Sequence, residues 1–135
     1  MLKIGDGVTP WLDLEGIDSN DGNYDDIISE LESQLIGKPG SGQNGEIFND
    51  SNNIASGDYS HAEGYENSAT GYASHVEGKK NIASGEYQHV QGKYNVEDTE
   101  NNYAHIVGGG TEGARKNIHT LDWNGNAWFA GNLKI

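Results

Sequence analysis

Residues 56–78, SGDYSHAEGYENSATGYASHVEG, contain nearly the same phrase twice, as SHAEG at 60–64 and SHVEG at 74–78. The histidines of the two phrases, His61 and His75, are 14 residues apart. His89 follows after another 14 residues and His105 after 16, so the last copy has a two-residue insertion. A period of this length predicts a solenoid, in which every coil stacks on the one before it.

Two other features recur with the same period. Glycines stand at 57, 71 and 85 and again seven residues later at 64, 78 and 92, and we expect them to form the two corners of each coil by taking positive φ. Small apolar residues fall into two columns, which we expect to face each other inside the coil: Ala55, Ala69 and Ala83 on one arm, and Ala62, Val76, Val90 and Ile106 on the other.

The composition excludes several classes of function. The chain has 21 Asp and Glu against 8 Lys and Arg, a formal net charge of −13, so we expect neither nucleic acid nor anionic lipid as a partner. It has no cysteine, which leaves no disulfide framework or thiolate metal site. The sequence contains no apolar run of the length of a signal peptide or a membrane span, so we expect no membrane insertion and no secretory route.

We expect three regions: an N-terminal module at 1–40, the repeats at 41–110 and a C-terminal hairpin at 111–135. The N-terminal module should contain short extended pieces up to about residue 17 and then an amphipathic helix with Ile28, Leu31 and Leu35 on one face. DSNDG at 18–22 opens like a calcium-binding loop, but Gly22 occupies a ligand position and Ser29 stands where the last Glu belongs, so we interpret it as a solvated turn.

The C-terminal region begins after Gly108–Gly110, which we expect to release the chain from the solenoid. Asn124-Gly125 then predicts a type I′ hairpin turn that places Leu121 opposite Trp128.

The predicted coil is too narrow to stabilise a single chain. Its interior is mostly alanine and valine, and the burial of so little apolar surface does not offset the conformational entropy lost on folding. Ile54 and Ile82, on the face opposite the alanines, and the apolar face of the helix are candidate contacts between chains. Packing of the helix on its own N-terminal strands stays an alternative.

The repeat also resembles a known family. NIASGDYSHAEG (53–64) and NSATGYASHVEG (67–78) are similar to the head repeats of YadA-like trimeric autotransporter adhesins. The two ends, LKIGDGVTPWLDLEG and HIVGGGTEGARKNIHTLDWNGNAWFAGNL, resemble phage fibre, tail and appendage proteins. The resemblance implies a mainly β fold: a homotrimeric, left-handed parallel β-roll (a β-solenoid) with a short N-terminal strand and helix module and a C-terminal β-hairpin cap.

The candidate site residues fall into two groups. We interpret the repeated histidines as a structural column with hydrogen-bonding Glu63, Glu77 and Gln91 beside it, and an ion site on the trimer axis is the alternative: His61, His75, His89 and His105. Aromatic residues that offer a face to a sugar ring are candidate glycan contacts: Tyr59, Tyr87, Tyr103, Trp123 and Trp128. For the two tryptophans we favour the core of a small terminal cap, and the sugar-binding surface is the alternative.

No sequence pattern of a catalytic site is present: the chain contains no G-x-S-x-G, H-E-x-x-H or P-loop motif, and we assign it no catalytic residue and no cofactor. We therefore expect a non-enzymatic, trimeric phage fibre or tail appendage protein that assembles in the host cytoplasm with other virion tail or fibre proteins. It would act outside the cell by binding a bacterial surface glycan. Two alternatives stay open: the head fragment of a bacterial adhesin, and a tail-associated protein that degrades glycans or cleaves itself.

Overall fold

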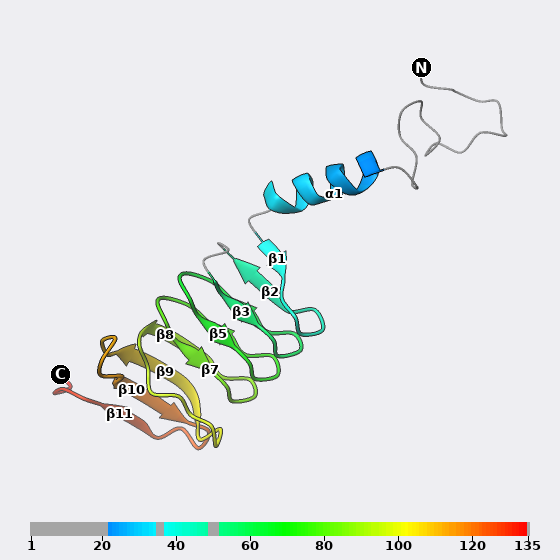
Figure 1. Cartoon of the computed structure of the whole chain (residues 1–135). Helices are drawn as coiled ribbons and strands as arrows, with labels where there is room; N and C mark the ends of the chain where they lie inside the picture. The colour runs from blue at the N-terminus through cyan, green and yellow to red at the C-terminus, as the bar shows by residue number, and fades with distance from the viewer. Residues whose placement is uncertain (1–21, 35–36, 49–51, 135) are drawn as a thin grey trace. The chain divides into compact units, whose positions relative to one another are not determined.

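The computed structural model describes residues 22–34, 37–48 and 52–134, which form one helix and a series of short strands (Figure 1). The chain divides into two compact units, Met1–Leu35 and Ile36–Ile135. The elements follow each other in the order α1 (Gly22–Gln34), β1 (Gly37–Pro39), β2 (Glu46–Phe48), β3 (Ile54–Ala55), β4 (His61–Ala62), β5 (Ser68–Ala69), β6 (His75–Val76), β7 (Ile82–Ala83), β8 (His89–Lys93), β9 (Tyr103–Gly109), β10 (Asn117–Asp122) and β11 (Ala127–Phe129).

The first unit contains α1, which confirms the predicted helix. Asp25 lies in its first turn, where a negative charge is favoured by the helix dipole. Ile28 and Leu31 are both exposed within this unit. Leu35, the expected extended pieces before residue 17 and most of the DSNDG turn lie outside the described residues.

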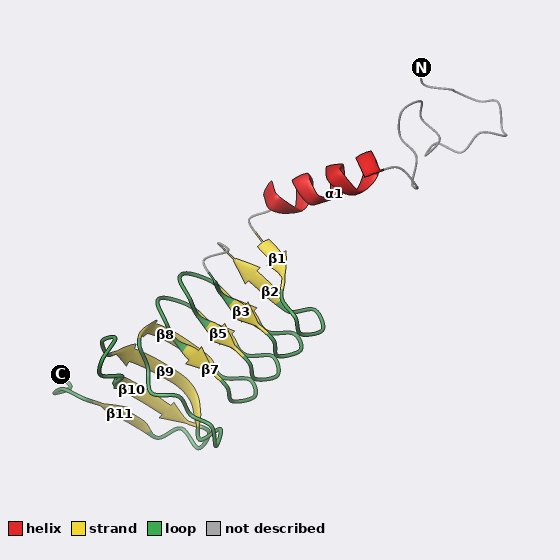
Figure 2. Cartoon of the chain, in the orientation of Figure 1, coloured by secondary structure: helices red, strands yellow, loops and turns green. Residues whose placement is uncertain are grey.

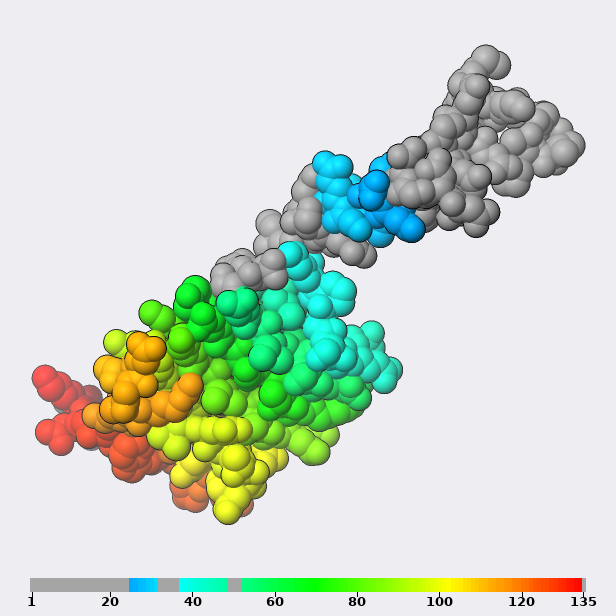
Figure 3. All heavy atoms as spheres, viewed as in Figure 1, coloured from blue at the N-terminus to red at the C-terminus, as the bar shows by residue number. Residues whose placement is uncertain are grey.

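The second unit is a β-solenoid of about four turns, as the 14-residue period predicts (Figure 2). Each of the three 14-residue coils contributes one short strand to each of two sheets, and the last, longer coil contributes a strand to the larger sheet only. The larger sheet, here called sheet A, has the order β1-β2-β4-β6-β8-β9-β10-β11, and the smaller, sheet B, has the order β3-β5-β7. Within the repeat the strands are parallel, with His61 paired to His75 and His75 to His89. In the space-filling view the successive coils appear as neighbouring bands, from cyan through green to yellow (Figure 3).

The interior of the solenoid consists of the two predicted columns. All seven side chains are at most 1% exposed and form one core cluster: Ala55, Ala62, Ala69, Val76, Ala83, Val90 and Ile106. Four of the seven are alanine, so each coil buries little apolar surface. On the opposite face of sheet B, Ile54 is 49% exposed and lies in register with Ser68 and, one coil further, Ile82. This placement confirms that Ile54 and the alanines face opposite sides of the strand.

A ladder of buried asparagines, one per coil, links the coils at one corner. The Oδ1 atom of each accepts a hydrogen bond from the backbone N–H of the next, at 2.8 Å from Asn53 to Asn67 and 2.9 Å from Asn67 to Asn81. The Nδ2 group of Asn67 donates to the carbonyl oxygens of Glu63 and Gly78. The amides therefore satisfy the polar backbone groups that a tight corner leaves without strand partners.

The two glycine columns have different roles, which corrects the prediction that both take positive φ. Gly64, Gly78 and Gly92 have φ between 93° and 100°, as expected of a glycine corner. Gly57, Gly71 and Gly85 do not, and the positive φ on that side belongs to non-glycine residues such as Tyr59 and Tyr87. Glycine is needed there for space, because a Cβ atom on Gly57 would overlap the carbonyl oxygen of Gly71 in the next coil.

The two-residue insertion of the last copy lies in the loop between Asn95 and Tyr103, so strand register is kept across it. His89 still pairs with His105 and Val90 with Ile106. The loop is held by Asp98, whose Oδ2 accepts hydrogen bonds from Gln88 Nε2 at 3.0 Å and from the N–H of Tyr103 at 2.8 Å.

The parallel winding of the solenoid ends at Gly108–Gly110, as expected, but the chain that follows stays in sheet A. β9 runs to Gly109, and its residues 105–109 pair with the whole of β8. β10 then returns antiparallel to β9, and β11 antiparallel to β10, so the C-terminal hairpin extends sheet A.

The predicted hairpin turn is also corrected. Leu121 pairs with Ala127, and it is Thr120 that lies opposite Trp128. Gly125 alone of the loop residues 123–125 takes a positive φ, 88°, and its N–H donates to the carbonyl oxygen of Asp122. The loop is therefore a three-residue connection with glycine in the left-handed position, because Asp122 and Asn126 still pair across it.

Candidate functional site

The outer face of sheet A presents a continuous column of aromatic rings in contact, some stacked or tilted and some edge to face. The four repeated histidines lie in it as predicted, with ring centroids 4.7 Å apart for His61–His75 and His75–His89 and 5.2 Å for His89–His105. The fifth histidine, His119 on β10, continues the column at 5.5 Å from His105. A phenylalanine ends the column at each side: Phe48 at 5.6 Å from His61, and Phe129 at 4.5 Å from His119.

Glutamates lie beside the histidines, and each bonds mainly to the histidine of the following coil. His75 Nε2 lies 3.1 Å from Glu63 Oε1, and His89 Nε2 lies 3.2 Å from Glu77 Oε1. Glu63 also approaches His61, with 3.9 Å between Oε2 and Nε2. The hydrogen bond with His75 lowers the pKa of Glu63 below its ordinary value. The expected hydrogen-bonding neighbours are thus confirmed for these two glutamates.

The column changes character at His105. The residue beside it in the preceding coil is Gln91, which carries no charge. His105 Nε2 is buried and has no hydrogen-bond partner among the described residues. Burial, together with neighbouring His89 and His119, lowers the pKa of His105, so its neutral form is favoured.

A second aromatic column runs along a corner of the coils. Tyr72 lies between Tyr59 and Tyr87, with ring centroids 5.6 and 5.7 Å away and edge-to-face contacts on both sides. All three rings are exposed. Sequence comparison of the copies missed Tyr72, because it stands one position before the tyrosine column of the repeat. Tyr103, expected in the same column, instead packs against the core cluster.

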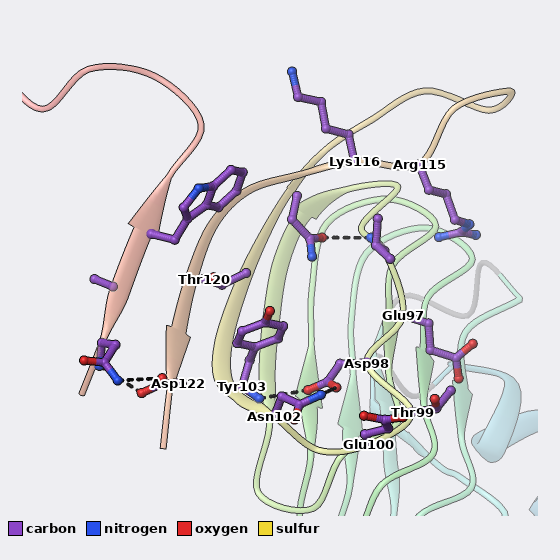
Figure 4. A pocket seen from close by; sticks show the side chains of 15 residues that line it. Glu97, Asp98, Thr99, Glu100, Asn102, Tyr103, Arg115, Lys116, Thr120 and Asp122 are labelled. Carbon is purple, nitrogen blue, oxygen red and sulfur yellow. Dashed lines mark hydrogen bonds between the residues drawn. The ribbon is translucent and has the colours of Figure 1, made fainter. Parts of the chain in front are cut away.

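A cleft of about 790 Å³ opens at the C-terminal end of the roll, between β10–β11 and the loop that follows Asn95. Sheet B ends at β7, so no strand of it covers the inner face of β10 and β11. The ring of Tyr103 lies in the space between β10, which carries Thr120 and Asp122, and the loop at 97–100 (Figure 4). Trp128 also lines the cleft and is 51% exposed.

At the C-terminal end, Trp123, Trp128 and Phe129 are all exposed in the single chain. Their surroundings differ. Trp123 Nε1 donates to the carbonyl oxygen of Asn101 at 2.9 Å and fastens the hairpin loop to the last coil. Trp128 faces the cleft, whereas Phe129, the next residue of β11, stacks on the outer histidine column.

Two carboxylates of the cleft are already occupied by hydrogen bonds. Besides the contacts of its Oδ2, Asp98 accepts a bond at Oδ1 from Asn102. Asp122 Oδ1 accepts from the N–H groups of Asn124 and Asn126, and its Oδ2 accepts from Asn126 Nδ2. The bonds from Asn126 contribute most to lowering the pKa of Asp122. Both groups are thus placed to organise loops and to present polar edges.

Within the described residues, α1 is too short to cross a membrane and no helix meets the length and apolarity that a span requires. Comparisons of the whole chain with protein-family models, with curated proteins and with solved structures yield no match.

Proposed function

We propose that this chain is a non-enzymatic, carbohydrate-binding module of a homotrimeric phage fibre or tail appendage, which holds a bacterial surface glycan in its C-terminal cleft. The observation that carries the proposal is the exposed ring of Trp128 at a cleft with polar walls. A sugar ring has apolar C–H faces and hydroxyl edges, so it is bound by an aromatic plane with hydrogen-bonding groups around it.

The size and chemistry of the cleft support a glycan ligand. Its volume lies within the roughly 300–1,000 Å³ typical of small-ligand sites. Asn102, Glu97 and Glu100 on the loop and Asn126 on the hairpin supply amide and carboxylate groups beside the aromatic ring. The lining has four carboxylates against two cations, Arg115 and Lys116, and this net negative charge favours a neutral or cationic saccharide over a phosphorylated one.

The hydrogen bonding of Asp98 and Asp122, two of the four carboxylates that line the cleft, supports a binding role over glycoside hydrolysis. Hydrolysis ordinarily uses one carboxylic acid as proton donor beside a second carboxylate. Asp122 has a lowered pKa, and both oxygens of Asp98 accept hydrogen bonds, so these two groups are suited to holding loops in place.

Trimer formation is supported by the thin core and by exposed apolar residues on sheet B. Ile54 is about half exposed and Ile82 continues its column, so a second chain at this face would bury both. Three identical clefts would then give a weak glycan site useful avidity. The experiment is light scattering coupled to gel filtration, and a monodisperse monomer at micromolar concentration would contradict this part of the proposal.

Glycan binding is tested by screening the purified chain on an array of bacterial surface glycans, followed by calorimetry with the best ligand. Trp128→Ala should abolish measurable binding, because it removes the aromatic plane of the cleft. Phe129→Ala is the matched control: it removes a similarly exposed ring from the opposite face of the same strand and should bind as the parent does. Absence of any glycan ligand, or equal loss in both variants, would overturn the glycan proposal.

A further inference from the structure

The histidine column contains two overlapping groups with the composition of a metal site. The first is His61, Glu63 and His75, and the second, one coil further, is His75, Glu77 and His89. In each group one nitrogen or oxygen atom per residue lies within 4.8 Å of the other two. The groups sit on the outer face of sheet A, away from the cleft side of β11, and their side chains are partly exposed.

The distances between the glutamates and the histidines are close to those of a metal site, and all three ligand atoms of each group lie within 4.8 Å of one another. Ligand atoms at about 2.0–2.1 Å from a tetrahedral zinc ion are about 3.3 Å apart. Glu63 Oε1 lies 3.1 Å from His75 Nε2, close to this value, and the other carboxylate oxygen, Oε2, lies 3.9 Å from His61 Nε2. In the second group Glu77 lies 3.2 Å from His89 Nε2.

We propose that each chain binds one divalent ion of the zinc class on the outer face of sheet A, through His61, Glu63 and His75 or through His75, Glu77 and His89. Imidazole nitrogen and a single carboxylate suit Zn²⁺, Co²⁺, Ni²⁺ or Cu²⁺, whereas Ca²⁺ and Mg²⁺ require oxygen ligands. The two groups share His75, and two dications one coil apart would repel each other. We therefore expect each chain to bind one ion, at one group or the other.

The strands fix these ligands before an ion arrives. His61, His75 and His89 occupy paired positions on three parallel strands, with ring centroids 4.7 Å apart, edge to face for His61–His75 and stacked for His75–His89. A site of this kind requires little ordering on binding, and ligand atoms bound to one ion from two coils would join those coils. Three protein ligands leave a coordination position for water.

The next pair of histidines in the column, His89 and His105, has a glutamine in place of the glutamate and can be compared with the two proposed metal groups. His89 and His105 repeat the paired geometry, but Gln91 replaces the glutamate and His105 Nε2 is buried. An amide is a much weaker ligand than a carboxylate. We therefore expect binding only at the two groups that contain Glu63 and Glu77. Substituting these two residues with glutamine would give each group the ligands of the third one, His89, Gln91 and His105.

The test is calorimetric titration of the chelator-treated full chain with Zn²⁺ at neutral pH, together with the visible absorption spectrum of the Co²⁺ form. We expect one Zn²⁺ per chain and no comparable binding of Ca²⁺. Glu63→Gln combined with Glu77→Gln should weaken Zn²⁺ binding by at least about tenfold. Either single substitution leaves one group intact and should retain binding.

The matched control is Glu86→Gln combined with Glu112→Gln, which removes the same charge from exposed positions outside the column. It should bind Zn²⁺ as the parent does, and circular dichroism on all variants shows whether each is folded. Absence of saturable Zn²⁺ binding to the parent, equal binding of Ca²⁺, or equal affinity in the two double variants would overturn the proposal. None of these variants alters the cleft, so this test is independent of the glycan proposal.

Discussion

Asn67 Oδ1 accepts the backbone N–H of Asn81, in the next coil, at a distance of 2.9 Å. The same side chain donates from Nδ2 to the carbonyl oxygens of Glu63, at 2.6 Å, and Gly78, at 2.8 Å. A single buried amide therefore satisfies backbone groups of two coils, including the coil that follows it.

Replacement of this amide should be costly. Asn67→Ala leaves one backbone donor and two carbonyl oxygens with a lost partner, and we expect the free energy of unfolding to fall by on the order of 3 kcal/mol. Urea unfolding followed by circular dichroism measures it. Asn132→Ala, an exposed asparagine near the C-terminus, is the control and should have no effect beyond about 0.5 kcal/mol. Equal stability of the two variants would contradict the role of the ladder.

Because the coils are closely stacked, we expect a methyl group added at Gly71 to destabilise the fold. In Gly71→Ala the new Cβ would overlap the carbonyl oxygen of Gly85, which is backbone and cannot rotate away. We expect the variant to be unfolded or to melt far below the parent. Gly113→Ala adds the same methyl group where no atom lies within 4 Å, and its melting temperature should equal or exceed that of the parent. Similar melting of the two variants would show that the coils are less tightly stacked.

The two faces of strand β8 should respond differently to substitution. Val90 is fully buried in the core cluster, so Val90→Asp places an unpaired charge in the narrow interior and should cost more than about 4 kcal/mol. His89 is partly exposed on the outer face, and His89→Ala removes its ring contacts with His75 and His105 and one hydrogen bond to Glu77. Thermal melts in the presence of a chelator measure both changes. Equal losses would mean that the faces are assigned wrongly.

Acid should loosen the C-terminal hairpin loop at a pH set by Asp122. Hydrogen bonds from Asn126 and Asn124 lower the folded-state pKa of this carboxylate below its usual 3.8. The stabilisation is complete above pH 3.8, where the unfolded chain is also ionised, and is lost as the pH falls through the lower folded value. NMR of the Asn124, Gly125 and Asn126 amides should show a midpoint below 3.8 that Asp122→Asn abolishes. A midpoint at or above pH 3.8 would contradict the lowered pKa of Asp122.

The repeat made the interior of the solenoid predictable, because residues 14 apart must occupy equivalent positions in equivalent coils. The alanine and valine columns and the order of the four repeated histidines followed from this alone. The role of the leading asparagine was not recognised, since the copies show that it recurs but not which backbone groups it satisfies.

Features outside the period were not predicted. His119 joins the column only because β10 returns antiparallel to β9 with an irregular register, which no spacing in the sequence reveals. Tyr72 stacks between Tyr59 and Tyr87 from a shifted position, because rings of this length reach across a one-residue offset. The hairpin register depended on whether the loop contains two or three residues, and NG alone does not distinguish these cases.

Because every coil presents to the next the same surface that it receives from the one before, the solenoid can lengthen or shorten by whole repeats of 14 residues without creating a new interface. A gain or loss of one residue within a strand would instead displace the asparagine, histidine and core columns together. The 16-residue step shows the tolerated exception, since its two extra residues are accommodated in a loop outside both sheets. Recombination between copies is thus a route by which relatives of this chain would vary in reach while keeping one fold.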